Sequence, residues 1–119
     1  MGALLLVLLL SAATSYGQSH FVEVARELGI DFVHDNGASP QKRLPETNGA
    51  GSAFLDYDDD GDWDLYLVNS GDMERGRGTA SNQLFRNDGR AFVRVDGAAG
   101  APGTSYGMGV TAADYDGDG

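Results

Sequence analysis

The chain contains no cysteine in its 119 residues. It therefore forms no disulfide, and any stability that its fold lacks must come from bound metal or from further repeats. Basic residues are scarce as well: eight Lys and Arg stand against 18 Asp and Glu, giving a net charge of −10 at pH 7. Nucleic acid and anionic membranes would repel such a chain, so neither is an expected partner.

Apolar runs long enough to cross a membrane are missing too. The run Leu4–Leu10 has seven residues, followed by small residues from Ser11 to Ser15, whereas a spanning helix needs about 20. This pattern matches a secretory signal, although no Lys or Arg precedes it; a buried strand or a misassigned start codon is the alternative. We expect a signal peptide over residues 1–17, cleaved after Ser15 or Gly17. The protein is then secreted, or periplasmic in a bacterium, without stable membrane insertion.

Proline is rare and glycine abundant, with three Pro against 18 Gly. Many tight turns of this kind are typical of all-β repeat proteins. Four strands are predicted at about 51–56, 64–69, 82–87 and 91–95, with a hairpin turn at Asn87–Gly89 between the last two. A four-stranded antiparallel unit of about 60 residues has the size of a propeller blade, which buries its faces only against neighbouring blades.

The acidic stretch Asp56–Asp64 holds six carboxylates in nine residues, and no Lys or Arg lies between Arg43 and Arg75. Two carboxylates about 4 Å apart repel by roughly 4 kcal/mol at an effective dielectric constant near 20. A fold keeps such a cluster if a cation sits within it or if the side chains spread into water. Short apolar runs on both sides, and Tyr57 and Trp63 inside the stretch, favour the cation over a solvated acidic run.

The spacing of these carboxylates predicts a calcium loop between two strands. Aspartates at loop positions 1, 3 and 5 converge on one point, and Gly61 at position 6 allows the sharp turn. An EF-hand would need Glu at position 12, where this chain has Leu67, and helices on both sides. Hard oxygen ligands favour Ca²⁺ over Mg²⁺, and the absence of Cys from the chain and of His from the loop argues against Zn²⁺. The predicted ligands are Asp56, Asp58, Asp60, Asp62 (through its backbone carbonyl) and Asp64.

The loop is repeated 58 residues later. Residues 48–61 align with residues 106–119, and both copies contain Gly-x-Gly-x-x-x-x-Asp-Tyr-Asp-x-Asp-Gly. The second copy predicts a further calcium loop with ligands Asp114, Asp116 and Asp118. The pattern of Phe21–Ala25 returns at Phe92–Asp96, which predicts an earlier strand at residues 21–25.

These observations predict four regions. After the signal peptide, residues 18–50 carry the last strand of a preceding blade and a long polar loop at 34–47. Residues 51–105 form a complete blade, and residues 106–119 open the next blade and stop within its calcium loop. We therefore interpret the sequence as a fragment of a longer protein.

Three further features are not predicted to be catalytic. His34 is expected to be a surface or capping side chain, and Arg75 and Arg77 are expected to be solvated. The segment Gly103–Gly107 fits the Gly-x-Ser-x-Gly pattern of hydrolases. However, the nucleophile of that pattern lies between a strand and a helix, and here a loop precedes a predicted strand.

The flanking motifs carry a family resemblance from Phe21 onward. The loop Asp56–Asp64 between strands resembles the FG-GAP/VCBS repeats of integrin-α-type β-propellers. The chain is most similar to the cartilage acidic protein/ASPIC-UnbV-like secreted proteins. This finer likeness rests on 21–25 with 29–32 and His34, on 44–51 (LPETNGAG), on 64–69 (DLYLVN) and on 82–89 (NQLFRNDG).

This resemblance implies an all-β fold: a fragment of an integrin-α-type (FG-GAP) β-propeller with one complete four-stranded blade and parts of two neighbours. It also implies a seven-bladed type of ring, Ca²⁺ at each acidic loop, export, and binding rather than catalysis. The leading hypothesis is a secreted, non-enzymatic calcium-binding scaffold for adhesion, with an extracellular protein or glycan as partner. The alternative is an extracellular polysaccharide lyase or hydrolase built on a calcium propeller.

Overall fold

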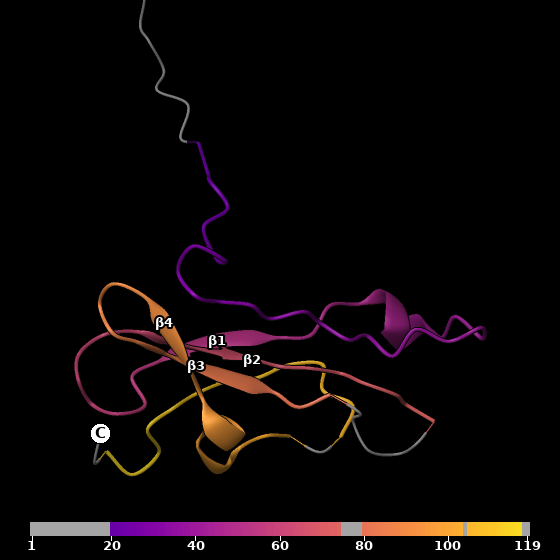
Figure 1. Ribbon diagram of the computed structural model, residues 1–119. Coiled ribbons are helices and arrows are strands. Elements are labelled where there is room, and N and C mark those ends of the chain that lie inside the picture. The colour runs from indigo at the N-terminus through magenta and orange to yellow at the C-terminus, as the bar shows by residue number, and fades with distance from the viewer. Residues whose placement is uncertain (1–19, 75–79, 104, 118–119) are drawn as a thin grey trace, which may run out of the picture.

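The computed structural model describes residues 20–74, 80–103 and 105–117. Four strands form one antiparallel sheet in the order β1-β2-β3-β4 (Figure 1). Their bounds are Ser52–Leu55 for β1, Asp64–Leu67 for β2, Gln83–Asn87 for β3 and Phe92–Val95 for β4. Two short 3₁₀ helices, η1 (Leu44–Thr47) and η2 (Asp96–Gly100), complete the regular structure of these residues. The predicted all-β fold is confirmed, and each of the four predicted strands forms to within two residues of its expected ends.

The core lies on β3, one of the two inner strands of the sheet. Leu84 and Phe85 are both buried, although they point to opposite faces of the sheet. Leu84 lies opposite Tyr66 on β2 and Val95 on β4, and η2 packs against this face with Ala98 buried. Both faces of the sheet are therefore buried at these two consecutive residues of β3.

The edge strands keep apolar side chains in solvent. Phe54 on β1 is 62% exposed and Val93 on β4 is 46% exposed. β1 and β4 each pair with one neighbouring strand only, so their outer edges have no partner strand within the described residues. One four-stranded unit thus buries the apolar residues of β3 and leaves those of its edge strands exposed, as expected for a single repeat.

The predicted strand at residues 21–25 is wrong. Phe21 is fully exposed, and Ala25–Gly29 forms a turn. Within it the Leu28 amide donates to the Val24 carbonyl at 2.9 Å and the Ile30 amide to the Ala25 carbonyl at 2.8 Å. Because the turn uses these backbone groups, they are not available to a strand ladder. The segment still touches the sheet, since the Phe92 amide donates to the Leu28 carbonyl.

The C-terminal segment likewise forms no strand in residues 105–117, where the opening of a further blade was predicted. It passes close to the start of β1, because a Cβ placed on Gly51 would lie 2.8 Å from Gly109 Cα. Its contacts with the rest of the chain run through the Gly107 carbonyl and the Tyr106 hydroxyl rather than through a ladder of backbone bonds. Figure 1 shows this segment in yellow, turning back past the strands towards the C-terminus.

The predicted polar loop at 34–47 is irregular apart from a turn at residues 40–41 and helix η1. No helix in the described parts of the chain has the length and apolar character needed to cross a membrane. The predicted signal peptide at residues 1–17 and the two arginines Arg75 and Arg77 lie outside the described residues.

Candidate metal centre

The acidic loop connects β1 to β2 and closes through a sharp turn at Gly61. The φ angle of Gly61 is +89°, a left-handed conformation that glycine adopts without steric cost. This is the turn that the sequence places at loop position 6. It folds the loop back so that its first and last aspartates come together.

Asp56 organises the first half of the loop. Its Oδ1 accepts a hydrogen bond from the Asp60 amide at 3.1 Å, and its Oδ2 accepts one from the Gly61 amide at 2.9 Å. Asp60 in turn accepts a bond from the Asp62 amide at 2.9 Å. These bonds to backbone N–H groups hold the loop curved around its carboxylates.

Asp64, the first residue of β2, is fully buried. Its Oδ2 accepts a bond from the Tyr57 amide at 2.9 Å and its Oδ1 accepts one from the Asn87 amide at 2.8 Å. One carboxylate therefore ties the loop to the end of β3. A buried charge is costly unless hydrogen bonds or an opposite charge compensate it, and two backbone donors supply part of that compensation here.

Asp58 differs from Asp56 and Asp64, because no backbone N–H of the described residues bonds to its carboxylate. Partial burial, together with the charges of Asp60 and Asp64, raises the pKa of Asp58, and the nearby Arg86 guanidinium acts in the opposite direction. The Arg86 Nε lies 4.0 Å from Asp58 Oδ2. The neighbouring aspartates thus disfavour the ionised form of Asp58 more than Arg86 favours it.

Three of the predicted ligands converge. One carboxylate oxygen each from Asp56, Asp58 and Asp64 lie within 4.8 Å of one another. Oxygens that bind one Ca²⁺ at about 2.4 Å are separated by at most about 4.8 Å, so this spacing fits a single ion. The donors are all hard oxygens, as Ca²⁺ requires. The three carboxylates could hold a metal ion.

Asp60 and Asp62 lie outside this group of three. The Asp60 carboxylate accepts the Asp62 amide, and the Asp62 carboxylate faces Gly89, where an added Cβ would lie 3.6 Å from its Oδ2. Asp62 was predicted to bind through its backbone carbonyl, a role that leaves the side chain free to point elsewhere.

The second acidic loop has a different shape. The Asp114 carboxylate accepts a bond from the Gly117 amide at 2.8 Å, and Asp116 is exposed. Asp118 lies outside the described residues. Within the described ranges, only the group Asp56, Asp58 and Asp64 brings three acidic side chains close enough for one ion. A hollow of about 820 Å³ lies between the two loops, with Trp63 and Tyr115 among its lining residues.

Supporting residues on the β3–β4 hairpin were not singled out by the sequence. Asn87 fixes Asp64 through its amide and donates its side-chain N–H to the Trp63 carbonyl at 3.3 Å. Arg86 approaches Asp58 from the same strand. The motif NDG signals a turn, but no local signal states that this turn lies against a loop more than 20 residues earlier.

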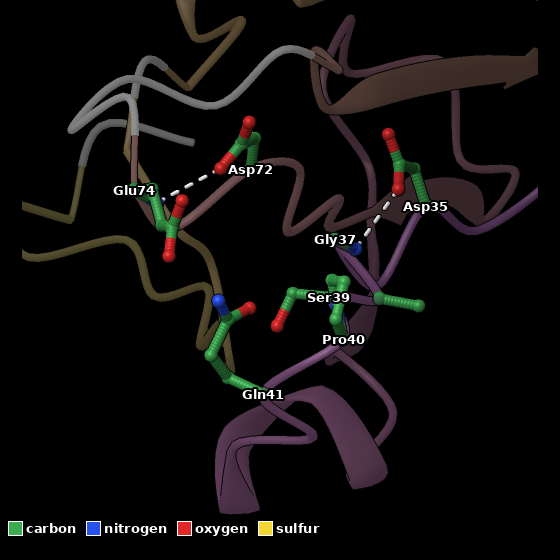
Figure 2. A pocket seen from close by; sticks show the side chains of 8 residues that line it. Asp35, Gly37, Ser39, Pro40, Gln41, Asp72 and Glu74 are labelled. Atoms are coloured by element: carbon green, nitrogen blue, oxygen red, sulfur yellow. Dashed lines mark hydrogen bonds between the residues drawn. The ribbon is translucent and has the colours of Figure 1, made fainter.

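A second acidic hollow, of about 530 Å³, lies beside the long loop (Figure 2). Its carboxylates bond to protein groups: Asp35 accepts the Gly37 amide at 2.9 Å, Asp72 accepts the Glu74 amide at 2.8 Å, and Glu74 pairs with Arg43 at 2.6 Å. Figure 2 shows Asp35 on one side of the hollow and Asp72 and Glu74 on the other. These carboxylates do not converge on a point.

His34 was predicted to be a surface or capping side chain, and it instead bonds to a buried serine. It is half-buried, with its Nε2 3.1 Å from the Ser70 hydroxyl, which itself donates to the Gly107 carbonyl at 2.7 Å. Because the single hydroxyl proton is used towards Gly107, the histidine ring nitrogen donates to Ser70. Neighbouring amides extend the network: Asn69 accepts the Asp35 amide at 2.7 Å, and Asn82 accepts the Asn69 amide at 2.8 Å.

Comparison with known proteins agrees with this geometry. The model of the FG-GAP-like repeat family matches residues 56–119, which is more than half of the chain and includes both acidic loops. No curated protein and no solved structure matches the chain. FG-GAP repeats form the blades of β-propeller interaction domains, and the four-stranded antiparallel sheet is a fragment of such a blade. The chain belongs to the FG-GAP-like repeat family.

Proposed function

We propose that this chain is part of a secreted, non-catalytic calcium-binding β-propeller protein that serves as a scaffold for adhesion or protein interaction. The observation that carries the proposal is the convergence of Asp56, Asp58 and Asp64 between β1 and β2. Within the FG-GAP-like family, we assign the chain to the cartilage acidic protein/ASPIC-UnbV-like group, on the strength of the motifs around the loop.

Ca²⁺ is the ion that best suits this loop. The residues that would hold it are Asp56, Asp58 and Asp64, joined by Asp60 and by the backbone carbonyl of Asp62. Ca²⁺ accepts six to eight oxygen ligands in flexible geometry, whereas Mg²⁺ demands a strict octahedron and retains its waters. By the repeat of the sequence pattern, Asp114, Asp116 and Asp118 would form the corresponding site of the next blade.

The bound ion would stabilise the turn between β1 and β2. It removes the repulsion among carboxylates that the fold holds within 4.8 Å of each other, and so couples metal binding to folding. Extracellular calcium modules commonly have dissociation constants of about 10⁻⁴–10⁻³ M, which suits a structural ion in a calcium-rich compartment. The expected signal peptide at residues 1–17 would deliver the protein there.

His34 and Ser70 are hydrogen-bonded as a catalytic Ser–His pair would be, but the direction of their hydrogen bonds supports a non-catalytic role. In a hydrolase the histidine would accept the serine proton, but here Ser70 directs that proton to the Gly107 carbonyl and is buried. The pair joins three segments of the chain and presents no nucleophile to solvent. The partner proposed for the scaffold is an extracellular protein or glycan.

Calcium titration of the 119-residue chain tests the proposal, with the fluorescence of Trp63 as the signal. Trp63 is the sole tryptophan and is 64% exposed between Asp62 and Asp64. We expect a saturable change that EGTA reverses and that Mg²⁺ reproduces weakly. The variant Asp58→Asn/Asp60→Asn should lose the response. The variant Asp31→Asn/Asp59→Asn removes the same charge without touching a predicted ligand and should keep it.

A response that survives in Asp58→Asn/Asp60→Asn would contradict the assignment of these ligands. A wild-type chain whose fluorescence does not change up to about 10 mM Ca²⁺, ten times the upper end of the expected range, would overturn the calcium function. Detection of the chain in culture medium, compared with a chain lacking residues 1–17, tests export separately.

A further inference from the structure

Arg86 lies between two carboxylates of different kinds. On one side its Nε and Nη2 donate to Asp88 Oδ1 and Oδ2 at 2.6 and 3.2 Å, a two-pronged ion pair within the β3–β4 hairpin. On the other side its Nε lies 4.0 Å from Asp58 Oδ2, beyond hydrogen-bond distance. Among the described residues, Arg86 is the one cation paired with a carboxylate of the acidic loop.

Asp58 is the ligand on which this cation would have most influence. Asp56 and Asp64 each accept two backbone N–H bonds, whereas no backbone donor of the described chain bonds to Asp58. Of the three converging carboxylates, Asp58 therefore has the negative charge that backbone N–H donors stabilise least. A guanidinium that moved closer would form a direct ion pair with Asp58 and would compete with a divalent ion for the same oxygens.

Asp88 prevents that movement. The bidentate pair fixes the orientation of the guanidinium plane, and the Asp88 amide is anchored to the Ala91 carbonyl at 2.9 Å. The hydrogen bond from Arg86 lowers the pKa of Asp88, so Asp88 stays ionised over a wide pH range. The same hairpin fixes Asp64 through the Asn87 amide, and so it positions a ligand and restrains a competing cation together.

We propose that Arg86 is the counter-ion of the metal-free acidic loop, and that Asp88 holds its guanidinium back from Asp58 so that a divalent cation can enter. The inference rests on the proposed calcium function and adds a positioning role for two residues that bind no metal. It makes the affinity of the loop depend on an ion pair in a neighbouring hairpin.

A double-mutant cycle on the 119-residue chain tests the proposal, with Ca²⁺ titrations followed by Trp63 fluorescence at low ionic strength. Removing a positive charge near a divalent ion strengthens binding, and we expect Arg86→Gln to tighten the dissociation constant about three- to tenfold. Asp88→Asn releases Arg86 towards Asp58 and should weaken binding by about the same factor. In the double variant, Asp88→Asn should have an effect of less than about twofold, because no guanidinium remains to be released.

Two further variants separate the ion pair from general charge effects. Arg90→Gln removes a positive charge from the same hairpin, but Arg90 pairs with no described carboxylate, so the change should be less than about twofold. Arg86→Lys keeps the charge but loses the bidentate geometry. A lysine that Asp88 cannot orient should weaken calcium binding, the opposite of the effect of Arg86→Gln.

Metal-free unfolding gives a readout that needs no calcium. In EGTA, Arg86→Gln should lower the unfolding midpoint, because Asp58 then loses its only cation, and added Ca²⁺ should restore it. Equal weakening by Asp88→Asn with and without Arg86 would overturn the proposal, as would equal effects of Arg86→Gln and Arg90→Gln. A calcium response in the wild type with an additive cycle refutes this inference alone; a wild type that does not respond refutes the proposed function and this inference with it.

Discussion

Buried polar side chains lie at both ends of β2, but their charges and partners differ. At its start, Asp64 brings a charge into a group of three carboxylates that only backbone N–H donors and one arginine partly compensate. Just past its end, Asn69 and Ser70 are also buried, but their partners are amides, a carbonyl and the His34 ring. The proposed calcium ion would complete the first end, whereas the polar groups at the second end have their partners within the protein.

Because of this difference, a metal ion should stabilise the acidic loop before β2 but not the hydrogen-bonded network after β2. The network beyond β2 joins the long loop, β3 and the C-terminal segment through hydrogen bonds that exist without any ion. The acidic loop gains its full stability only when its charges are neutralised. Substitutions in this network (the network end of β2) should therefore change the unfolding free energy equally with and without calcium. Substitutions in the acidic loop (the loop end of β2) should have effects that depend on calcium.

The largest expected effect comes from Gly37→Ala at the network end. Gly37 has a φ angle of +65°, and an added Cβ would lie 1.9 Å from the Gly71 carbonyl oxygen. A left-handed alanine and a backbone overlap together should cost about 3 kcal/mol or more of unfolding free energy. Urea denaturation should show this loss in both EGTA and Ca²⁺. Gly49→Ala, where an added Cβ meets nothing within 4 Å, is the matched control and should change little.

A smaller loss is expected for Asn82→Ala. Its Oδ1 accepts the amide of buried Asn69 at 2.8 Å, and its Nδ2 donates to the Tyr66 hydroxyl at 2.9 Å. Leaving a buried backbone N–H without an acceptor should cost about 2 kcal/mol. The same urea measurement should give equal losses with and without Ca²⁺. If Ca²⁺ restored the unfolding free energy of Asn82→Ala, the two ends of β2 would be energetically coupled, and the proposed difference between them would be wrong.

Asp64→Asn acts at the loop end and should depend on calcium. An asparagine oxygen can accept one of the two amides that Asp64 holds, but its NH₂ group cannot accept the other, which should cost about 1 kcal/mol in EGTA. In Ca²⁺ the gap to the wild type should widen, because the variant also lacks a ligand charge. A gap that stays constant as Ca²⁺ is added would remove Asp64 from the ligand set.

The smallest and most specific effect concerns pH. The pKa of Asp58 is raised in the folded state, chiefly by burial and by the charges of neighbouring aspartates. The ionised side chain therefore destabilises the metal-free fold at neutral pH, and this penalty disappears as pH falls through the folded pKa towards the ordinary value of 3.8. In EGTA, Asp58→Asn should be more stable than the wild type at pH 7, and the difference should vanish below about pH 4. Asp31→Asn, outside the loop, should show no such trend.

Local patterns in the sequence were enough to predict the four strands and the candidate loop. Alternating and short apolar runs, bounded by turn residues, mark strands because a pleated strand exposes alternate side chains. Gly61 marks the turn of the loop because glycine accepts a positive φ. The same local patterns predicted a strand at Phe21–Ala25 and the opening of a further blade in residues 106–119. Neither forms a strand in the described residues, since a strand also needs a partner with free backbone groups.

The supporting contacts of the site could not be read in this way. Asn87 and Arg86 follow the acidic loop by more than 20 residues, and they reach Asp64 and Asp58 only because β3 pairs with β2 in one register. His34 and Ser70 lie far apart in sequence and meet through the fold. A shift of one residue in the pairing of β3 with β2 would turn the Arg86 side chain to the other face of the sheet.

The sequence by itself determined that nine residues would crowd six negative charges into a turn between two strands, because charge, spacing and glycine are local properties. Only the tertiary structure decided which of those charges meet. Asp56, Asp58 and Asp64 converge because backbone amides from the loop and from β3 fix two of them, while Asp60 and Asp62 turn to other partners. Such convergence depends on hydrogen bonds between distant segments, whose free energies are settled only when the sheet has formed.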